Sequence, residues 1–370
     1  MSPDVVIVGG GIQGLSTAVH LGHRGVRTLV IEKDYCGRHA SGVNAGGVLR
    51  AGRYPEELPI SHAALEIWSG AQSIVDDDCG FRPIGRLKIA ESDDEMAHLA
   101  ECAAFVRRLG YDHECLLDRG ELRELEPGVG AHAVGALLVP GDGHANPFRT
   151  VAAYRRKARS LGSEVREGTR VLGARRIGGT WRIDTDGGAV EAPVLVNTAG
   201  AWGDRIAAAI GDPVPLEAVA PMLMVTGRMP TVMRTRIGAV DRVLSIVQIP
   251  NGTVVIGGGY LGRADRDANA TTLDYEKLAF NAQIAATMFP ALRDARIVRC
   301  WAGIEGHTPD GRPVIGPSAS EEGAFHAFGF CSHGFHLGPA IGRILAELVT
   351  SGRSNLPIEP FRVDRFAPRG

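Results

Sequence analysis

The sequence predicts an α/β fold into which a mainly antiparallel β layer is inserted. Residues 5–8 form a β-branched run, residues 12–21 repeat apolar side chains at helical spacing, and residues 28–31 form a second apolar run. Residues 213–298 differ, because several strand-like segments there accompany a single helix-like one. The 370 residues are enough for two domains.

Three glycines, Gly9, Gly11 and Gly14, stand between the first strand and the helix at the spacing of a dinucleotide-binding fingerprint. In that motif the first glycine permits a tight turn, the second brings backbone close to a pyrophosphate, and the third lets helix and strand pack closely. Glu32 closes the second strand, where a carboxylate accepts hydrogen bonds from ribose hydroxyls. The sequence therefore predicts a Rossmann-type dinucleotide-binding domain, the alternative being a glycine-rich turn without a ligand.

The composition is that of an ordinary globular protein, with 44% hydrophobic and 22% charged residues. A formal net charge of −2 argues against a general nucleic-acid binder. The 6 cysteines are scattered without a CxxC pair, so we expect neither a disulfide framework nor a metal site. The chain opens on a strand rather than a signal peptide and contains no apolar run of transmembrane length. We therefore expect a cytoplasmic protein.

The remaining elements follow in order along the chain. Residues 34–50 are rich in glycine, alanine and serine, which favours a loop wrapped around a ligand over a mobile surface loop. We expect helices at about 56–77, 92–109, 118–125, 147–161, 203–210, 274–288 and 340–349. We expect strands at about 83–90, 135–139, 164, 170–174, 181–185, 194–202, 216–226, 243–249, 253–258 and 324–328, with Asn251-Gly252 as a two-residue hairpin turn.

A second glycine-rich turn, residues 329–339, leads into the last predicted helix. The N-terminus of a helix offers free N–H groups and the positive end of its dipole to an anion. We therefore expect the C-terminal part of the chain to return to the bound dinucleotide.

Four motifs stand in a fixed order: the fingerprint with Glu32, residues 40–47 (ASGVNAGG), residues 197–202 (NTAGAW), and the pair 301–316 and 333–339. Together they resemble the D-amino-acid-oxidase superfamily of FAD-dependent amine oxidoreductases, the group of glycine oxidase, sarcosine oxidase and the proline and hydroxyproline dehydrogenases. The resemblance covers essentially the whole chain and implies a glutathione-reductase-like fold of the D-amino-acid-oxidase type. It implies a discontinuous FAD-binding domain of residues 1–80, 141–212 and 299–370, and a substrate-binding domain of residues 81–140 and 213–298.

The resemblance also implies which residues hold FAD in its extended form. From the N-terminal part these are Gly9, Gly11, Ile12, Gln13, Gly14, Glu32, Lys33, Arg38, Ser41, Asn44, Ala45, Gly46 and Gly47. From the rest of the chain they are Val171, Ala199, Gly200, Trp202, Gly303, Gly334, Phe335, His336, Leu337 and Gly338. The helix after Pro339 is implied to direct its dipole at the N1/O2 edge of the flavin, where it stabilises the anionic reduced ring.

Enzymes of this group oxidise amino acids by hydride transfer from the carbon next to nitrogen to flavin N5, and water hydrolyses the imine. The resemblance therefore implies oxidative deamination or dealkylation of a small amino acid, and the form of the motifs favours a secondary amine. A carboxylate clamp requires Arg or Lys. Arg50 matches the substrate-binding arginine of sarcosine oxidase-like members, Arg53 is its neighbour, and His336 stands where those members carry a lysine. A surface role for Arg50 and a supporting role for His336 are the alternatives.

Three departures from the family pattern affect these expectations. Glu305 stands where glycine oxidase-like members carry the arginine that grips the substrate carboxylate, so it either pairs with a substrate ammonium or is structural. Gly303 replaces the cysteine that tethers the flavin in monomeric sarcosine oxidase, and no histidine matches near Asn44, so we expect non-covalent FAD. An aliphatic residue near Val255 replaces the lysine credited with oxygen activation. Dioxygen and another electron acceptor therefore both stay open as the oxidant of the reduced flavin.

Other functions stay open at this point. The first is a flavin subunit that passes electrons to a partner protein, and an oligomeric state is compatible with it. A flavin monooxygenase would need NAD(P)H, and the sequence carries no second nucleotide fingerprint. A non-catalytic dinucleotide sensor is the last, although no attached regulatory module supports it.

Overall fold

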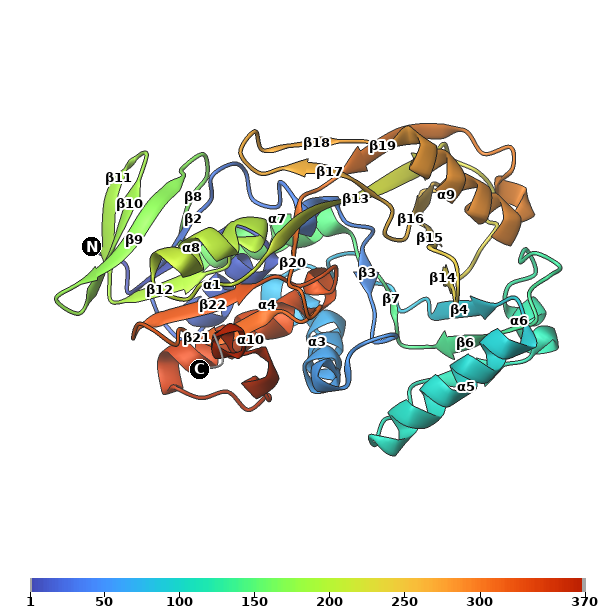
Figure 1. Ribbon diagram of the computed structural model, residues 1–370, viewed down its shortest axis with the longest axis horizontal. Coiled ribbons are helices and arrows are strands. Elements are labelled where there is room, and N and C mark those ends of the chain that lie inside the picture. Colours follow the sequence, from blue (N-terminus) through green and yellow to red (C-terminus); the bar gives the residue numbers. More distant parts are fainter. Residues whose placement is uncertain (1, 368–370) are drawn as a thin grey trace.

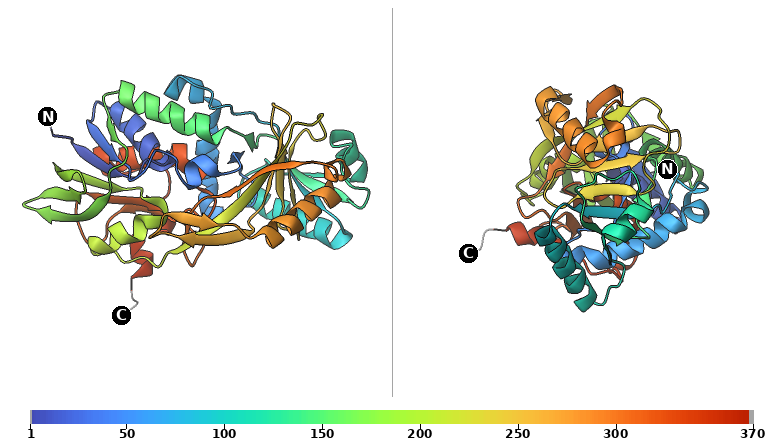
Figure 2. Two further views of the ribbon diagram at one scale, coloured as in Figure 1. Left: turned by 90° about the horizontal axis from the view of Figure 1, so that it is seen from above. Right: turned by 90° about the vertical axis from the view of Figure 1, so that its right-hand side faces the viewer.

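The computed structural model describes residues 2–367, in which a six-stranded sheet with its helices lies beside a larger, mainly antiparallel sheet (Figures 1 and 2). This arrangement confirms the predicted α/β fold class with its antiparallel layer. Within residues 2–367, no helix has both the length and the apolar character needed to cross a membrane.

The six-stranded sheet has the strand order β21-β22-β12-β1-β2-β8, and all neighbours except β21 and β22 run parallel. Its strands are β1 (Val5–Val8), β2 (Thr28–Ile31), β8 (Glu164–Arg166), β12 (Val194–Asn197), β21 (Val314–Pro317) and β22 (Ala324–Phe328). β1 and β2 are buried on both faces, as their continuous apolar runs predict.

Helices and a small sheet cover the two faces of this sheet. One face packs against α1 (Ile12–Gly22), α3 (Leu58–Ser69), α4 (Ala71–Val75), α7 (Pro147–Ser160) and α10 (Gly334–Ser351). The other face packs against α8 (Gly203–Ala209) and a three-stranded sheet of β9 (Val171–Ile177), β10 (Thr180–Thr185) and β11 (Gly188–Ala192). Figure 1 shows this small sheet at the end of the molecule remote from α9.

The last helix begins earlier than the sequence predicts. The sequence predicts a helix from residue 340, after the glycine-rich turn, but α10 begins at Gly334 and contains Pro339, a residue that disfavours a helix interior. Its packing on α1 explains how the helix tolerates the proline: a Cβ on Gly338 would lie 2.6 Å from Ile12 Cγ2, and one on Gly342 would lie 2.2 Å from Ser16 Oγ. Glycines at these positions let the two helices approach closely, and the contact outweighs one missing backbone hydrogen bond.

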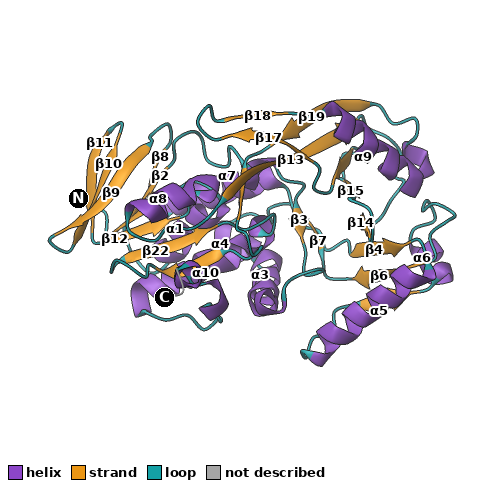
Figure 3. Cartoon of the chain, in the orientation of Figure 1, coloured by secondary structure: helices purple, strands orange, loops and turns teal. Residues whose placement is uncertain are grey.

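The larger sheet contains eleven strands, nine of which follow the order β18-β17-β13-β16-β15-β14-β4-β6-β5, while β19 and β20 also pair with β13. The first three in sequence are β4 (Arg86–Ala90), β5 (Cys115–Leu117) and β6 (Gly135–Val139). The others are β13 (Glu217–Thr226), β14 (Arg236–Ala239), β15 (Ser245–Gln248), β16 (Val254–Gly257), β17 (Leu261–Asp265), β18 (Ala270–Thr272), β19 (Ile297–Ala302) and β20 (Glu305–His307). Figure 3 shows α5 (Asp93–Arg108), α6 (Arg119–Leu125) and α9 (Tyr275–Met288) around it.

Two local expectations need correction. The turn between β15 and β16 is longer than two residues, because Ile249 N–H donates to Thr253 O at 2.9 Å and leaves residues 250–252 in the turn. The glycine-rich segment 34–50 is not entirely loop, since it contains α2 (Ala40–Val43) and β3 (Gly47–Val48), which pairs with β7 (Gly143–His144). The division into the two proposed domains stays a prediction; β19 and β20 lie largely in the range expected for the FAD-binding domain but pair with the larger sheet.

Candidate functional site

A cavity of about 380 Å³ opens at the carboxyl ends of the parallel strands. β1 and β2 contribute Val8 and Ile31 at their ends, and Thr198 follows β12. β1 lies between β12 and β2, so the cavity sits where the strand order of the sheet reverses, the usual ligand position in such sheets. Residues 329–335 close the cavity from the C-terminal side.

The fingerprint glycines stand where any side chain would clash with neighbouring backbone. Gly9 has a φ of +109°, and a Cβ there would lie 2.3 Å from Thr198 O. A Cβ on Gly14 would lie 2.1 Å from Gly9 O. α1 begins directly after Gly11 with no side-chain cap and no acidic residue in its first turn. Ile12 N–H donates to Ser41 Oγ at 3.0 Å, and the positive end of the helix dipole next to the cavity suits a diphosphate.

Glu32 lies at the cavity end of β2 with its carboxylate fixed. Its two oxygens accept hydrogen bonds from Gly10 N–H at 2.7 Å and from Asp34 N–H at 2.9 Å. Burial raises the pKa of Glu32, and these two hydrogen bonds oppose the rise. The remaining lone pairs are available to ribose hydroxyls, so the carboxylate fits the adenosine end of FAD.

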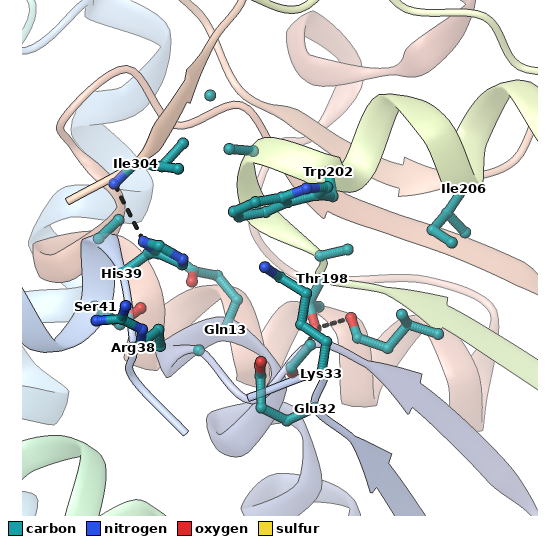
Figure 4. Close-up of a pocket in the computed structure, with 18 of the residues that line it drawn as sticks. Gln13, Glu32, Lys33, Arg38, His39, Ser41, Thr198, Trp202, Ile206 and Ile304 are labelled. Atoms are coloured by element: carbon teal, nitrogen blue, oxygen red, sulfur yellow. Dashed lines mark hydrogen bonds between the residues drawn. The ribbon is translucent and has the colours of Figure 1, made fainter. Parts of the chain in front are cut away.

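Lys33, His39 and Trp202 form a group of side chains above Glu32 in the view of Figure 4, where Lys33 extends from beside Glu32 toward the Trp202 ring. The Lys33 ammonium lies 3.6 Å from the centre of the Trp202 ring, and the His39 ring lies 5.1 Å from the same ring. Burial, with smaller contributions from Lys33 and Arg38, lowers the pKa of His39 to about 4. His39 is therefore neutral at pH 7, and Lys33 supplies the positive charge.

Asn269 connects this group to the larger sheet. It lies in the loop between β17 and β18, and its Oδ1 accepts from Lys33 Nζ at 2.5 Å and lies 2.8 Å from His39 Nε2. Asn269 Nδ2 donates to Asp34 Oδ2 at 2.8 Å. One loop of the antiparallel layer thus fixes side chains at the cavity rim. The sequence offered no signal for Asn269, because the contact depends on folding across some 230 residues.

The structure places many of the predicted FAD ligands on the cavity wall and others behind it. The wall includes Gly9, Gly11, Gln13, Glu32, Lys33, Arg38, Ser41, Asn44, Val171, Ala199, Gly200, Trp202, Gly334 and Phe335. Ile12, Gly14, Ala45, Gly46, Gly47, Gly303, His336, Leu337 and Gly338 are not among the lining residues. Lining residues that the sequence reasoning missed include His39, Arg170, Thr198, Arg205, Cys331 and Ser332. His39, Arg170 and Thr198 are each adjacent in sequence to a predicted FAD ligand, and this adjacency is the signal that could have found them.

Of the four predicted catalytic residues only Glu305 is on the cavity wall, and the charges of Arg50 and Arg53 both act on His336. Arg50 is buried, and its Nε lies 3.0 Å from Asp142 Oδ1. His336 is buried against α3, where its Nε2 lies 2.8 Å from Ser61 Oγ and 3.0 Å from Ser61 O. Burial lowers the pKa of His336 well below its usual value, so the ring is neutral. Glu305 lines the cavity, and its Oε2 accepts from Ser332 Oγ at 2.7 Å.

Arg53 differs from Arg50 in having no carboxylate partner. Its Nε donates to Leu49 O at 2.8 Å, and no Asp or Glu oxygen of residues 2–367 lies within 4 Å of its guanidinium. Burial lowers its pKa to about 10, and the negative charges of Glu57 and Asp142 oppose the change. The side chain is nevertheless partly accessible. Arg53 is therefore a cation free to receive an anion.

Comparison with known proteins places the fold and the cavity in a family. The family model described as "FAD dependent oxidoreductase" matches residues 4–348. The chain is 28% identical to the hydrogen cyanide synthase subunit HcnC of Pseudomonas aeruginosa, over 99% of this chain and 96% of that protein. It superposes on glycine oxidase from Geobacillus kaustophilus with a TM-score of 0.91 at 27% identity, covering 98% of this chain and 99% of the other. It superposes on L-proline dehydrogenase from P. horikoshii with a TM-score of 0.92 at 26% identity, covering 99% and 98%. The chain belongs to the FAD-dependent oxidoreductases of the D-amino-acid-oxidase family and is an enzyme of the amine-oxidising, glycine and sarcosine oxidase-like kind.

Proposed function

We propose that this enzyme oxidises a small amino acid at the carbon next to nitrogen, and that a secondary amine of the N-substituted glycine, sarcosine or proline type is preferred. FAD, when bound, accepts the hydride from that carbon at N5, and water then hydrolyses the substrate imine. The similarity to proteins named glycine oxidase and L-proline dehydrogenase supports this substrate class. The protein's own task is to hold the C–H bond in place and to bind the carboxylate.

The observation that carries the proposal is the free guanidinium of Arg53 beside the C-terminal turn. The pKa of His333 is lowered first by burial and second by the positive charge of Arg53, so the two residues are close. His333 directly precedes Gly334, which is on the cavity wall. Leu49 O holds the Nε, and the two terminal nitrogens are free for a bidentate carboxylate. Arg50 is already neutralised by Asp142, and His336 is neutral. We therefore propose Arg53 as the carboxylate ligand.

Glu305 has a positioning role in this proposal. Its carboxylate bonds Ser332 and lies 3.4 Å from His307 Nε2, so it fixes the turn that leads into α10. The first turn of α10 carries no acidic residue and no side-chain cap, so its N–H groups and dipole are free to stabilise negative charge on the reduced ring.

We propose that FAD is bound without a covalent link. Cys331 is the one cysteine among the described cavity-lining residues. Burial raises the pKa of its thiol, and its Sγ contacts Gly329 O at 3.4 Å. A protonated, hydrogen-bonded thiol is a poor nucleophile.

A flavin subunit that passes electrons to a partner protein is the second candidate. HcnC is itself named as a subunit. Val255, near the position where the oxygen-activating lysine was expected, is buried in an apolar group with Leu223 and Val247, against which Ala45 packs. The described members of that group are apolar and supply no ammonium to stabilise superoxide. Slow reoxidation in air of protein that substrate has reduced would favour this candidate.

An anaerobic titration tests the proposal. Glycine, sarcosine, L- and D-proline and hydroxyproline are added to the yellow protein, and flavin absorbance is followed. We expect bleaching by at least one amine, strongest with a secondary amine, and release of FAD into the supernatant after acid precipitation. Arg53→Gln should raise KM about 10- to 100-fold by removing a charge-assisted pair, with the exposed Arg263→Gln as the control. Bleaching by NADPH but by no amine would refute the proposal, and FAD that stays in the pellet would refute non-covalent binding.

A further inference from the structure

Two arginines lie side by side on one face of the larger sheet. β4 and β14 are parallel neighbours, and Arg86 and Arg236 are register partners in that pair. A Cβ on Gly238 would lie 2.6 Å from Arg86 Nη2, so the Arg86 side chain crosses β14 over a residue without a side chain. The intervening Leu87 and Ile237 point to the opposite face and belong to the apolar core under α9.

This arginine face looks toward the loop that precedes Arg53. Arg236 Nη1 donates to Ala45 O at 2.9 Å, and its Nη2 donates to Ser245 Oγ at 3.0 Å. A Cβ on Gly47 would lie 3.4 Å from Arg236 Cζ. Ala45 and Gly47 follow Asn44, which lines the cofactor cavity. Arg86 and Arg236 therefore stand between the sheet and the loop that runs along the proposed flavin site.

Three guanidinium groups in this region lack a carboxylate partner. Arg53, Arg86 and Arg236 have no carboxylate oxygen within 4 Å in the part of the chain that the structure describes. The nearby carboxylates are engaged elsewhere: Asp142 pairs with Arg50, Glu57 lies 2.8 Å from His333, and the charge of Glu114 interacts with Arg50 and Lys88.

Arg86 and Arg236 are both poorly solvated. Burial, with the nearby charge of Arg86, lowers the pKa of Arg236 to about 9, and burial also lowers the pKa of Arg86. Arg236 is only 4% exposed, and its Nε has no partner. A buried, unpaired guanidinium is costly, and a bound anion removes that cost. Arg86 and Arg53 remain partly accessible and can receive one.

We propose that the substrate carries two carboxylates, the first held by Arg53 next to the reacting carbon and the second held by Arg86 and Arg236. The substrate class is then an amino acid or secondary amine with a carboxylate on each arm, of which iminodiacetate is the simplest member. This inference rests on the proposed amine oxidation for the role of Arg53. The lack of a carboxylate partner for Arg86 and Arg236 is its independent support.

The test separates carboxylate recognition from amine oxidation. Oxydiacetate and methoxyacetate differ by one carboxylate and contain an ether in place of the amine, so their binding is read from the flavin spectrum of the oxidised protein without turnover. Iminodiacetate and sarcosine form the matched pair of amines, read by anaerobic flavin reduction. We expect the dicarboxylate of each pair to be favoured about 10- to 100-fold, the range of one or two charge-assisted contacts.

Variants locate the effect. Arg86→Gln and Arg236→Gln should each lower the ratio of oxydiacetate to methoxyacetate affinity toward one, while Arg263→Gln on the exposed part of β17 should leave that ratio as it is in the unaltered protein. If both variants lose FAD, Arg86→Lys provides the readout, since it keeps the charge and loses the bidentate geometry. Equal binding of oxydiacetate and methoxyacetate overturns the inference even when sarcosine reduces the flavin. A dicarboxylate preference in binding supports the inference even if no amine in the panel reduces the flavin, an outcome that refutes only the proposed oxidation.

Discussion

Substitution of Asp142 by Asn tests whether Arg50 is engaged structurally. Asp142 is fully buried, and its carboxylate accepts from Arg50 N–H at 2.8 Å, from Ala51 N–H at 3.1 Å and from Arg50 Nε at 3.0 Å. Asn keeps an acceptor oxygen for the backbone N–H groups but removes the negative charge. The Arg50 guanidinium would then stay buried beside the other arginines without a counterion.

The expected cost follows from burial rather than from distance. Removing one partner of a buried ion pair costs about 3–5 kcal/mol, whereas an exposed pair contributes about 0–1 kcal/mol. Asp4 and Arg27 form a shorter contact, 2.6 Å, but their side chains are 42% and 51% exposed. We therefore expect Asp142→Asn to lower the free energy of unfolding by about 3 kcal/mol, since one acceptor is retained, and Asp4→Asn by less than about 1 kcal/mol.

Urea unfolding of the FAD-loaded protein, followed by tryptophan fluorescence, measures both variants. The reasoning is refuted if Asp142→Asn costs no more than Asp4→Asn. A second reading comes from KM: if Arg50 were the substrate ligand and Asp142 its competitor, the Asn variant that remains folded would bind substrate more tightly. We expect no such gain.

Two further predictions concern the packing and protonation of α1. Gly342→Ala places a Cβ 2.5 Å from the backbone carbon of Ser16, so we expect a loss of about 1–3 kcal/mol despite the better helix propensity of alanine, together with a lower FAD content. Gly227→Ala is the control, because its Cβ would lie 3.8 Å from the nearest atoms and away from the cavity. His20 has its pKa lowered to about 4, by burial first and by Arg24 and Arg343 next. The unfolded chain therefore binds a proton that the native state does not bind between about pH 6.5 and 4, and stability should fall as the pH decreases through that window. His20→Gln should reduce the loss of stability between pH 7 and pH 5 by about 1–2 kcal/mol in urea titrations.

The cofactor half of the site was predictable because its signals are local. The run Val5–Val8, the glycine spacing and Glu32 lie within one strand–helix–strand unit, so sequence distance and spatial distance agree. The start of α10 was missed for a local reason too: Pro339 indicates a boundary, and only the close contact of Gly338 with Ile12 overrides it. Packing of α10 on α1 therefore overrides the low helix propensity of Pro339.

The proposed substrate side could not be predicted, because it depends on strand register. Arg86 and Arg236 become neighbours only when β4 pairs with β14 in one particular register, and a shift by one residue would turn both side chains into the apolar core. The contacts of Asn269 with Lys33 and His39 likewise depend on where the β17–β18 loop meets the first sheet. No pattern within a short window carries this information.

The two halves of the site therefore depend on different kinds of interaction, and mutations should separate them. The cofactor cradle is held by backbone approach, as the 2.1 Å contact that a Cβ on Gly14 would make with Gly9 O indicates, and added volume there should expel FAD before it alters substrate preference. The proposed substrate side depends on buried positive charge. Arg86 supplies such a charge and is not part of the apolar core of the larger sheet. Loss of that charge should change which acid binds while FAD content is kept. An arginine variant that loses FAD and a glycine variant that changes only substrate preference would together contradict this division.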